Sequence, residues 1–261
     1  MDRTALVTIL VDLIIVLKQG REPATVIKAA LPRALVPYYP IAGRIVEPAP
    51  VHRRSPTPET ACGSWASVDC GLKDVNSLEH PLVLSKEELL SFAPPEVNEE
   101  ESIFMLQVCV HFACGGFAVG IRFSHTVFDG LGAGQFLKAA AEIARGHARL
   151  PVEPVWCREA IPTPPKLSQG HPPSVAFCFE TSVFDIPLDH VSMVKNQQCS
   201  TFNVVTTVAW QCLTRAIGLQ PHVDVHLGFA ANARHLQRQL LPQEDFYGNC
   251  VRLPHNLCLF M

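Results

Sequence analysis

Apolar residues recur along this chain with two spacings, and each spacing predicts a different element. Apolar and smaller residues alternate over residues 116–124, which predicts a half-buried strand. A second apolar segment over residues 103–112 is joined to it through residues 113–115, so we expect an antiparallel hairpin. An Ala-rich segment over residues 132–145 follows a helical period and stops at Gly146, a residue typical of helix C-caps.

The N-terminal part of the chain predicts further elements. Residues 5–17 are apolar but include Asp12 and are shorter than the roughly 20 residues of a membrane span. We therefore expect a buried strand or helix there. Residues 22–35 have a helical period in which Pro32 should kink or shorten the helix, and a loop leading into a strand should follow over residues 36–46. Residues 84–90 predict a short helix with a capping box of Ser85 and Glu88.

A proline-rich segment suggests where one domain ends and the next begins. Residues 151–173 contain seven prolines, a composition typical of an extended linker. We expect an N-terminal lobe over residues 1–160, a linker over residues 161–175 and a second lobe over residues 176–261. The second lobe should contain strands over residues 175–184 and 223–230 and helices over residues 188–196 and 204–217. Because strands and helices alternate, the sequence favours a two-lobed protein of the α/β or α+β class.

Composition narrows the range of functions. The chain is 48% hydrophobic and 17% charged, so much of it is expected to be buried. Its net charge of −3 argues against a nucleic-acid partner. The ten cysteines include no CxxC pair, and Cys109 and Cys114 lack the spacing of zinc ligands. We therefore expect reduced thiols in a cytoplasmic protein with no metal cofactor.

The candidate catalytic residues lie within residues 125–130, which read His-Thr-Val-Phe-Asp-Gly and connect the predicted strand to the predicted helix. A histidine at such a corner is held by rigid elements and remains open to a cleft, as a general base must be. His125 is therefore the candidate base. Asp129 is either a second catalytic group or a structural carboxylate. Gly130 is either a position that cannot carry a Cβ or an ordinary turn glycine.

Three segments, in this order, resemble signatures of the plant BAHD acyltransferases, which transfer acyl groups from acyl-CoA to hydroxyl or amine groups. Residues 36–44 read VPYYPIAGR, residues 114–130 contain CGGF and HTVFDG, and residues 246–250 read FYGNC. Residues 19–23 also resemble the alcohol benzoyl- and acetyltransferase branch. The resemblance implies a chloramphenicol-acetyltransferase-like fold and a monomer. It implies acyl-CoA as co-substrate and a small alcohol or amine as acceptor.

The resemblance also implies roles for particular residues. His125 would remove the acceptor's proton as the acceptor attacks the thioester carbon. Asp129 would point away from the substrate and pair with Arg234, although Asn232 stands where many relatives carry Asp. Ser200, Thr201 and Asn249 match positions near the CoA and the reaction cleft. For Asn249, the sequence favours equally a donor to an oxyanion and a turn cap.

One family signature, DFGWG, does not occur in the sequence. We therefore expect an incomplete second lobe and little activity from the chain as it stands. Two functional hypotheses follow: an active acyltransferase, or an inactive truncated fragment with residual CoA binding. A third places the chain in another CoA-dependent branch, such as dihydrolipoyl transacylases or condensation domains. Against condensation domains, Ser124 stands where they carry a second histidine.

Overall fold

The chain forms two compact units. The computed structural model describes residues 10–43, 45, 62–63, 67–68, 70–79, 81–92, 102–157, 160, 182–195, 199–218, 225–228, 230–237, 245–252 and 255–258. Unit 1 comprises Met1–Gly170 and Ala233–Cys250, and unit 2 comprises His171–Asn232 and Val251–Met261. This division differs from the predicted one, because Ala233–Cys250, the return segment, packs with the first unit. The predicted linker over residues 161–175 lies outside the described residues.

A five-stranded mixed sheet forms the centre of unit 1, with the order β1–β5–β4–β2 and with β3 also paired to β4. Its strands are β1 (Leu10–Leu17), β2 (Cys62–Gly63), β3 (Ser67–Val68), β4 (Phe104–Phe112) and β5 (Phe117–Ser124). The predicted antiparallel hairpin of β4 and β5 is confirmed. β1 pairs antiparallel along the whole of β5. The apolar segment near the N-terminus is thus a strand, but its residues are only partly buried.

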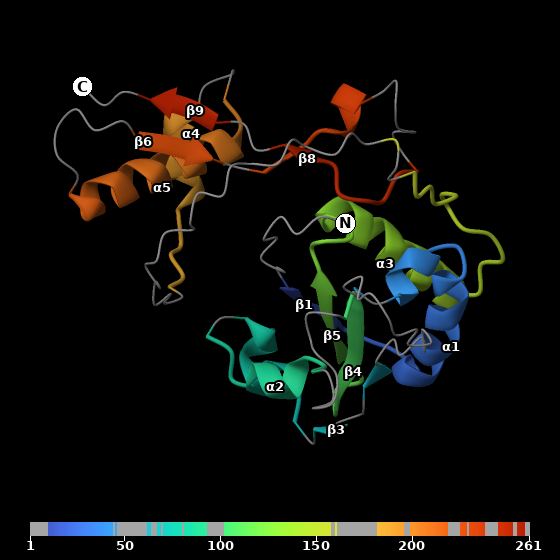
Figure 1. Cartoon of the computed structure of the whole chain (residues 1–261). Helices are drawn as coiled ribbons and strands as arrows, with labels where there is room; N and C mark the ends of the chain where they lie inside the picture. Colours follow the sequence, from blue (N-terminus) through green and yellow to red (C-terminus); the bar gives the residue numbers. More distant parts are fainter. Residues whose placement is uncertain are drawn as a thin grey trace, which may run out of the picture. The chain divides into compact units, whose positions relative to one another are not determined.

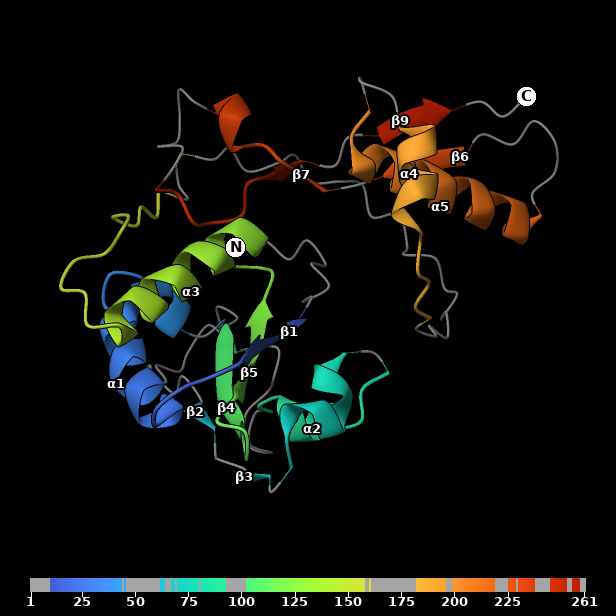
Figure 2. The ribbon, with the colours of Figure 1, turned by 180° about the vertical axis from the view of Figure 1, so that it is seen from behind.

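Helices cover both faces of this sheet (Figures 1 and 2). α1 (Pro23–Leu35) and α3 (Gly130–Ala144) pack together over one face. α2 (Lys86–Leu89) and the 3-10 segment η2 (Leu72–Leu78) contribute to a smaller core that contains Ala118 of β5. All eight residues of β5 are buried. The prediction of a half-buried strand is therefore wrong, because β5 lies between two neighbouring strands and two cores.

Two local capping signals in the sequence are confirmed. The Ser85 hydroxyl accepts a hydrogen bond from the Glu88 backbone N–H (3.3 Å), and the Glu88 carboxylate accepts one from the Ser85 N–H (2.8 Å). Gly146 follows α3 with a φ of +89°, the left-handed conformation expected of a residue that ends a helix. Both signals depend on neighbouring residues alone, which is why the sequence was sufficient.

Of the two effects expected of Pro32, the shortening of the first helix is wrong, and a kink stays a prediction. Pro32 lies inside α1, which continues to Leu35. Leu31 and Ala34 remain buried against the core, and Pro32 itself is exposed, so packing of the apolar face outweighs the one lost backbone donor. The predicted loop that follows contains the 3-10 helix η1 (Tyr39–Ala42).

The described residues of unit 2 form two helices and two small antiparallel sheets. The helices are α4 (Leu188–Val194) and α5 (Thr201–Ile217); the strand pairs are β6 (Val225–Gly228) with β9 (His255–Cys258) and β7 (Ala231–Asn232) with β8 (Val251–Arg252). The predicted helices and the strand near residue 225 are confirmed. Of the strand predicted over residues 175–184, only residues 182–184 are described, and they form no strand.

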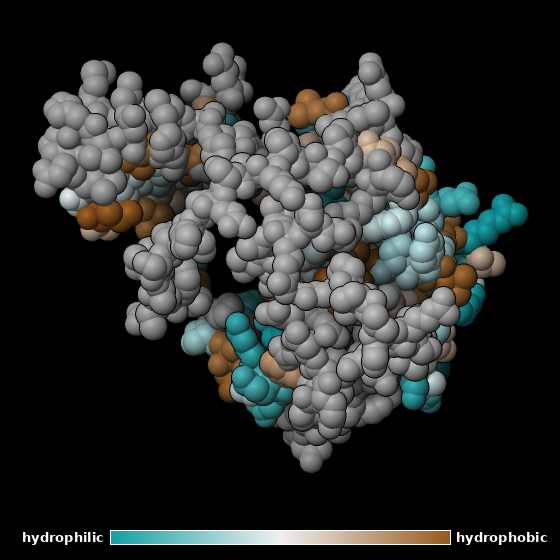
Figure 3. All heavy atoms as spheres, viewed as in Figure 1, coloured by the Kyte–Doolittle hydropathy of each residue, from teal (hydrophilic) through white to brown (hydrophobic). Residues whose placement is uncertain are grey.

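Much of α5 is exposed although it is apolar. Val204 is its one buried residue. Phe202, Leu213 and Ile217 are each at least 60% exposed. Figure 3 shows hydrophobic side chains on the surface where α5 lies in Figure 1.

Candidate active site

His125 lies at the corner between β5 and α3, where hydrogen bonds and packing fix the surrounding residues. The Ser124 N–H donates to the Ile103 carbonyl (2.8 Å), and the Val127 N–H donates back to the Ser124 carbonyl (3.3 Å). Phe128 is completely buried and stacks on Phe123, with ring centroids 4.9 Å apart. His125 itself is partly exposed. The residues around it are thus fixed by packing, while its side chain keeps access to solvent.

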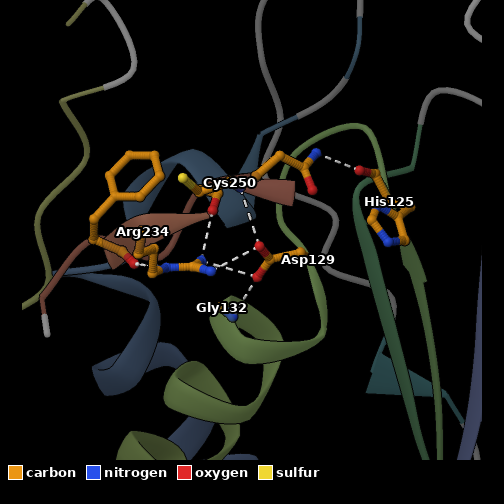
Figure 4. Close-up of polar contacts among 8 residues, drawn as sticks. His125, Asp129, Gly132, Arg234 and Cys250 are labelled. Carbon is orange, nitrogen blue, oxygen red and sulfur yellow. Dashed lines mark hydrogen bonds and ion pairs between the residues drawn. The ribbon is translucent and has the colours of Figure 1, made fainter. Parts of the chain in front are cut away.

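Asp129 is a buried structural carboxylate. It is 3% exposed and forms the N-cap of α3, accepting from the Gly132 N–H at 3.0 Å. It also accepts from the Cys250 N–H (3.1 Å) and from Arg234 at both oxygens (2.8 and 2.9 Å). In Figure 4 the carboxylate points toward Arg234 and away from His125. Of the two roles open for Asp129, the geometry supports the structural one.

Arg234 begins the 3-10 helix η5 (Arg234–Gln237) and is 5% exposed. Besides its two bonds to Asp129, it donates from Nε to the Phe246 carbonyl (3.0 Å) and from Nη2 to the Gly248 carbonyl (2.8 Å). A planar guanidinium suits such a bidentate pair. These contacts join the return segment to the loop after β5, which explains why the segment belongs to unit 1.

The signature segments, far apart in the sequence, lie side by side in the folded unit. Tyr38 of VPYYPIAGR packs on Tyr247 of FYGNC with ring centroids 4.8 Å apart, and on Phe136 of α3 at 5.3 Å. Asn249 of FYGNC donates from Nδ2 to the backbone carbonyl of His125 at 2.5 Å. The three segments therefore form one structural assembly around the start of α3.

The surroundings of Asp129 favour its ionised form. Burial opposes ionisation, but the hydrogen bonds from Arg234 and from the Gly132 and Cys250 N–H groups outweigh it and lower the pKa of Asp129 below its ordinary value. A carboxyl whose pKa is lower in the folded than in the unfolded chain stabilises the fold above the unfolded pKa of about 3.9. That stabilisation is lost as the pH falls through the folded-state pKa.

We therefore expect acid to weaken the fold through Asp129. The free energy of unfolding, measured by urea denaturation between pH 7 and pH 2, should fall in the acid range. The loss should be smaller in the double variant Asp129→Asn/Arg234→Met, which lacks the titrating group and its partner. Equal acid dependence of the two proteins would contradict this assignment.

Of the two roles open for Gly130, the structure does not support a position that excludes a side chain. A Cβ at Gly130 would meet nothing within 4 Å, and its φ is not in the left-handed region. The residue is exposed at the start of α3. The position that excludes a side chain is Gly132, where a Cβ would lie 1.8 Å from the Tyr247 carbonyl oxygen. Sequence reasoning missed Gly132, because its neighbour lies in the distant return segment.

Gly132→Ala is expected to destabilise the protein by roughly 1–3 kcal/mol or more, because backbone atoms on both sides must move apart. Gly134→Ala is the matched control. It is exposed on the same helix with open space around it, so alanine should stabilise by up to about 1 kcal/mol. Urea denaturation of both variants checks this, and equal stabilities would refute the tight contact.

The remaining predicted site residues lie in unit 2. Ser200 caps α5, its hydroxyl accepting from the Asn203 N–H at 3.1 Å. Thr201 is exposed, and its hydroxyl accepts from Lys195 Nζ at 3.5 Å. Their contact with CoA stays a prediction. Within the described residues, no group of three or more His, Cys, Asp or Glu could hold a metal ion. No helix in this part of the chain is long and apolar enough to cross a membrane.

Comparison with known proteins decides the family. Residues 11–190 match the model of the Transferase family. This chain belongs to that family, the BAHD acyltransferases. It is 42% identical over 251 residues to Acyl transferase 4 of Oryza sativa subsp. japonica, covering 88% of this chain and 57% of the relative. It is 40% identical over 273 residues to a myricetin 3-O-glucosyl 1,2-rhamnoside 6'-O-caffeoyltransferase (AT2) of Crocosmia x crocosmiiflora, covering 93% and 62%.

Solved structures confirm the fold. Vinorine synthase matches with a TM-score of 0.67 at 22% identity, covering 95% of this chain and 63% of that one. F. sporotrichioides TRI101 matches with a TM-score of 0.63 at 12% identity, covering 96% and 66%. The CoA-dependent acyltransferase fold expected from the sequence is therefore present. The chain spans 57% and 62% of the lengths of the two plant relatives described above.

Proposed function

We propose that this protein transfers an acyl group from acyl-CoA to a hydroxyl or amine group of a plant small molecule. The main support for the proposal is the position of His125, which is partly exposed at the packed corner between β5 and α3, with the Asp129 carboxylate pointing away from it. His125 takes the proton from the acceptor as the acceptor's oxygen or nitrogen bonds to the thioester carbon. The carbon–sulfur bond then breaks, and the proton passes to the CoA thiolate.

The similar proteins support this class of reaction. One relative is named a caffeoyltransferase, and a 31% identical protein of Taxus canadensis is named an N-benzoyltransferase. The similar TRI101 structure contains coenzyme A and T-2. We propose acyl-CoA as co-substrate, with Ser200 and Thr201 as candidate CoA contacts, in a monomeric cytoplasmic enzyme without a metal.

Release of free CoA thiol tests the proposal. The purified chain is supplied with acetyl-, benzoyl- or caffeoyl-CoA together with simple alcohols and amines. We expect thiol release that depends on the acceptor and that is lost in His125→Gln. Failure of every donor and acceptor pair to give acceptor-dependent release would contradict catalysis by this chain.

A second candidate function is binding of CoA with little turnover. The low turnover is favoured by the exposed apolar residues of α5 and by the two-stranded sheets of unit 2. Such sheets are marginally stable alone, so unit 2 would contribute weakly to a catalytic site. Titration calorimetry with CoA separates the two candidates. Heat of binding without thiol release supports the second, and thiol release with turnover supports the first.

A further inference from the structure

Two adjacent residues of the return segment hold opposite ends of the loop that carries the candidate base. Asn249 donates from its side-chain amide to the His125 carbonyl at 2.5 Å. Cys250 donates from its backbone N–H to the Asp129 carboxylate at 3.1 Å. Because the two donors are neighbours in the chain, they fix the two ends of the residue 125–129 segment relative to each other.

We infer that Asn249 is a positioning residue for His125, not a group that binds CoA or stabilises an oxyanion; its catalytic meaning rests on the proposed function. A hydrogen bond to the carbonyl of residue 125 restricts rotation of the peptide unit that follows His125. This restriction fixes the direction in which the imidazole leaves the backbone.

The surroundings of the Asn249 Oδ1 atom indicate that the side chain acts as a hydrogen-bond donor. Its Oδ1 is buried and has no hydrogen-bond partner among the described residues. The N–H₂ group therefore holds the amide in place, while the buried Oδ1 acceptor stays unpaired, which costs free energy. An ionised aspartate has the same shape but carries no donor. It cannot replace Asn249 against a backbone carbonyl.

The backbone of Asn249 is fixed by contacts that do not involve its side chain. Arg234 donates to the carbonyls of Phe246 and Gly248. A Cβ at Gly248 would lie 2.5 Å from the Phe246 ring, so the turn before Asn249 is tightly packed. Replacing the Asn249 side chain should leave the return segment in place and change only the hold on His125.

NMR of the His125 imidazole tests the inference without requiring turnover. Its resonances are assigned by their absence in His125→Gln. We expect both Asn249→Ala and Asn249→Asp to shift them, because neither side chain can donate to the His125 carbonyl. Asn76→Asp, the same change at an exposed residue of unit 1, is the control and should leave them unchanged.

Turnover gives a second readout. Both Asn249 variants should lower kcat by up to roughly 100-fold and leave the KM for acyl-CoA unchanged. Unchanged His125 resonances in both folded variants would overturn the inference. An unchanged kcat with a raised KM for acyl-CoA, as expected of a CoA-binding residue, would also overturn the inference. Absence of thiol release in the unaltered chain would count against the proposed function only, because the NMR result stands apart from it.

Discussion

Arg234→Ala is expected to lower the free energy of unfolding by roughly 3–5 kcal/mol, because it leaves the buried Asp129 carboxylate without its counter-charge. Asp129 and Arg234 are 3% and 5% exposed, so the carboxylate left behind is poorly solvated by bulk water. The substitution also removes the donors to the Phe246 and Gly248 carbonyls. Urea denaturation followed by circular dichroism measures the change.

The protein contains a matched control for this prediction. Arg145 pairs with Glu142 at 2.9 Å but is 64% exposed, so Arg145→Ala should cost no more than about 1 kcal/mol. Adding Asp129→Asn to an Arg234→Met background should recover part of the lost stability, because the lone buried charge is then removed while the Phe246 and Gly248 carbonyls still lack their donors. Equal effects of Arg234→Ala and Arg145→Ala would show that the buried pair does not hold the loop.

His125→Gln is expected to lower kcat/KM by roughly 10²–10⁴-fold, the usual contribution of a general base. Glutamine keeps the polarity of the position but cannot accept the proton at neutral pH. The variant should stay folded, because His125 is partly exposed and Phe128 and Asp129 continue to hold the loop. The measurement is thiol release from acyl-CoA at saturating acceptor, with circular dichroism as the check on folding.

His147→Gln is the control for the loss of a histidine. His147 is 60% exposed after the end of α3, and it contacts Glu142 at 3.2 Å. Its replacement should leave kcat/KM unchanged. Full thiol release by His125→Gln would exclude His125 as the base, whatever the stability of the variant.

The sequence predicts well those features that depend on nearby residues. The hairpin of β4 and β5, the capping box of Ser85 and the corner at His125 all follow from local patterns. The pairing of Asp129 with Arg234 was predicted from the family resemblance, and the structure confirms it. Pattern alone cannot find such a pair, since the partners lie 105 residues apart.

Three features that the local sequence pattern does not reveal share a physical cause. Gly130 and Gly132 are both glycines at the start of one helix, and only the approach of Tyr247 from the return segment distinguishes them. The burial of β5 depends on a second core on its other face, which no alternation within the strand reveals. The Asn249 contact with the His125 carbonyl likewise joins residues 124 positions apart. Each outcome depends on which distant segment packs against the site.

The central claim is that His125 carries the chemistry while Asp129 and Arg234 hold the loop that presents it. Comparing thiol release by Asp129→Asn/Arg234→Met with that by His125→Gln tests this most directly. The double variant removes the Asp129 charge without leaving a buried arginine unpaired. We predict that it folds and releases thiol more slowly than the wild type but faster than His125→Gln, which lacks the base and loses roughly 10²–10⁴-fold in kcat/KM. A double variant that is folded but as inactive as His125→Gln would contradict the account.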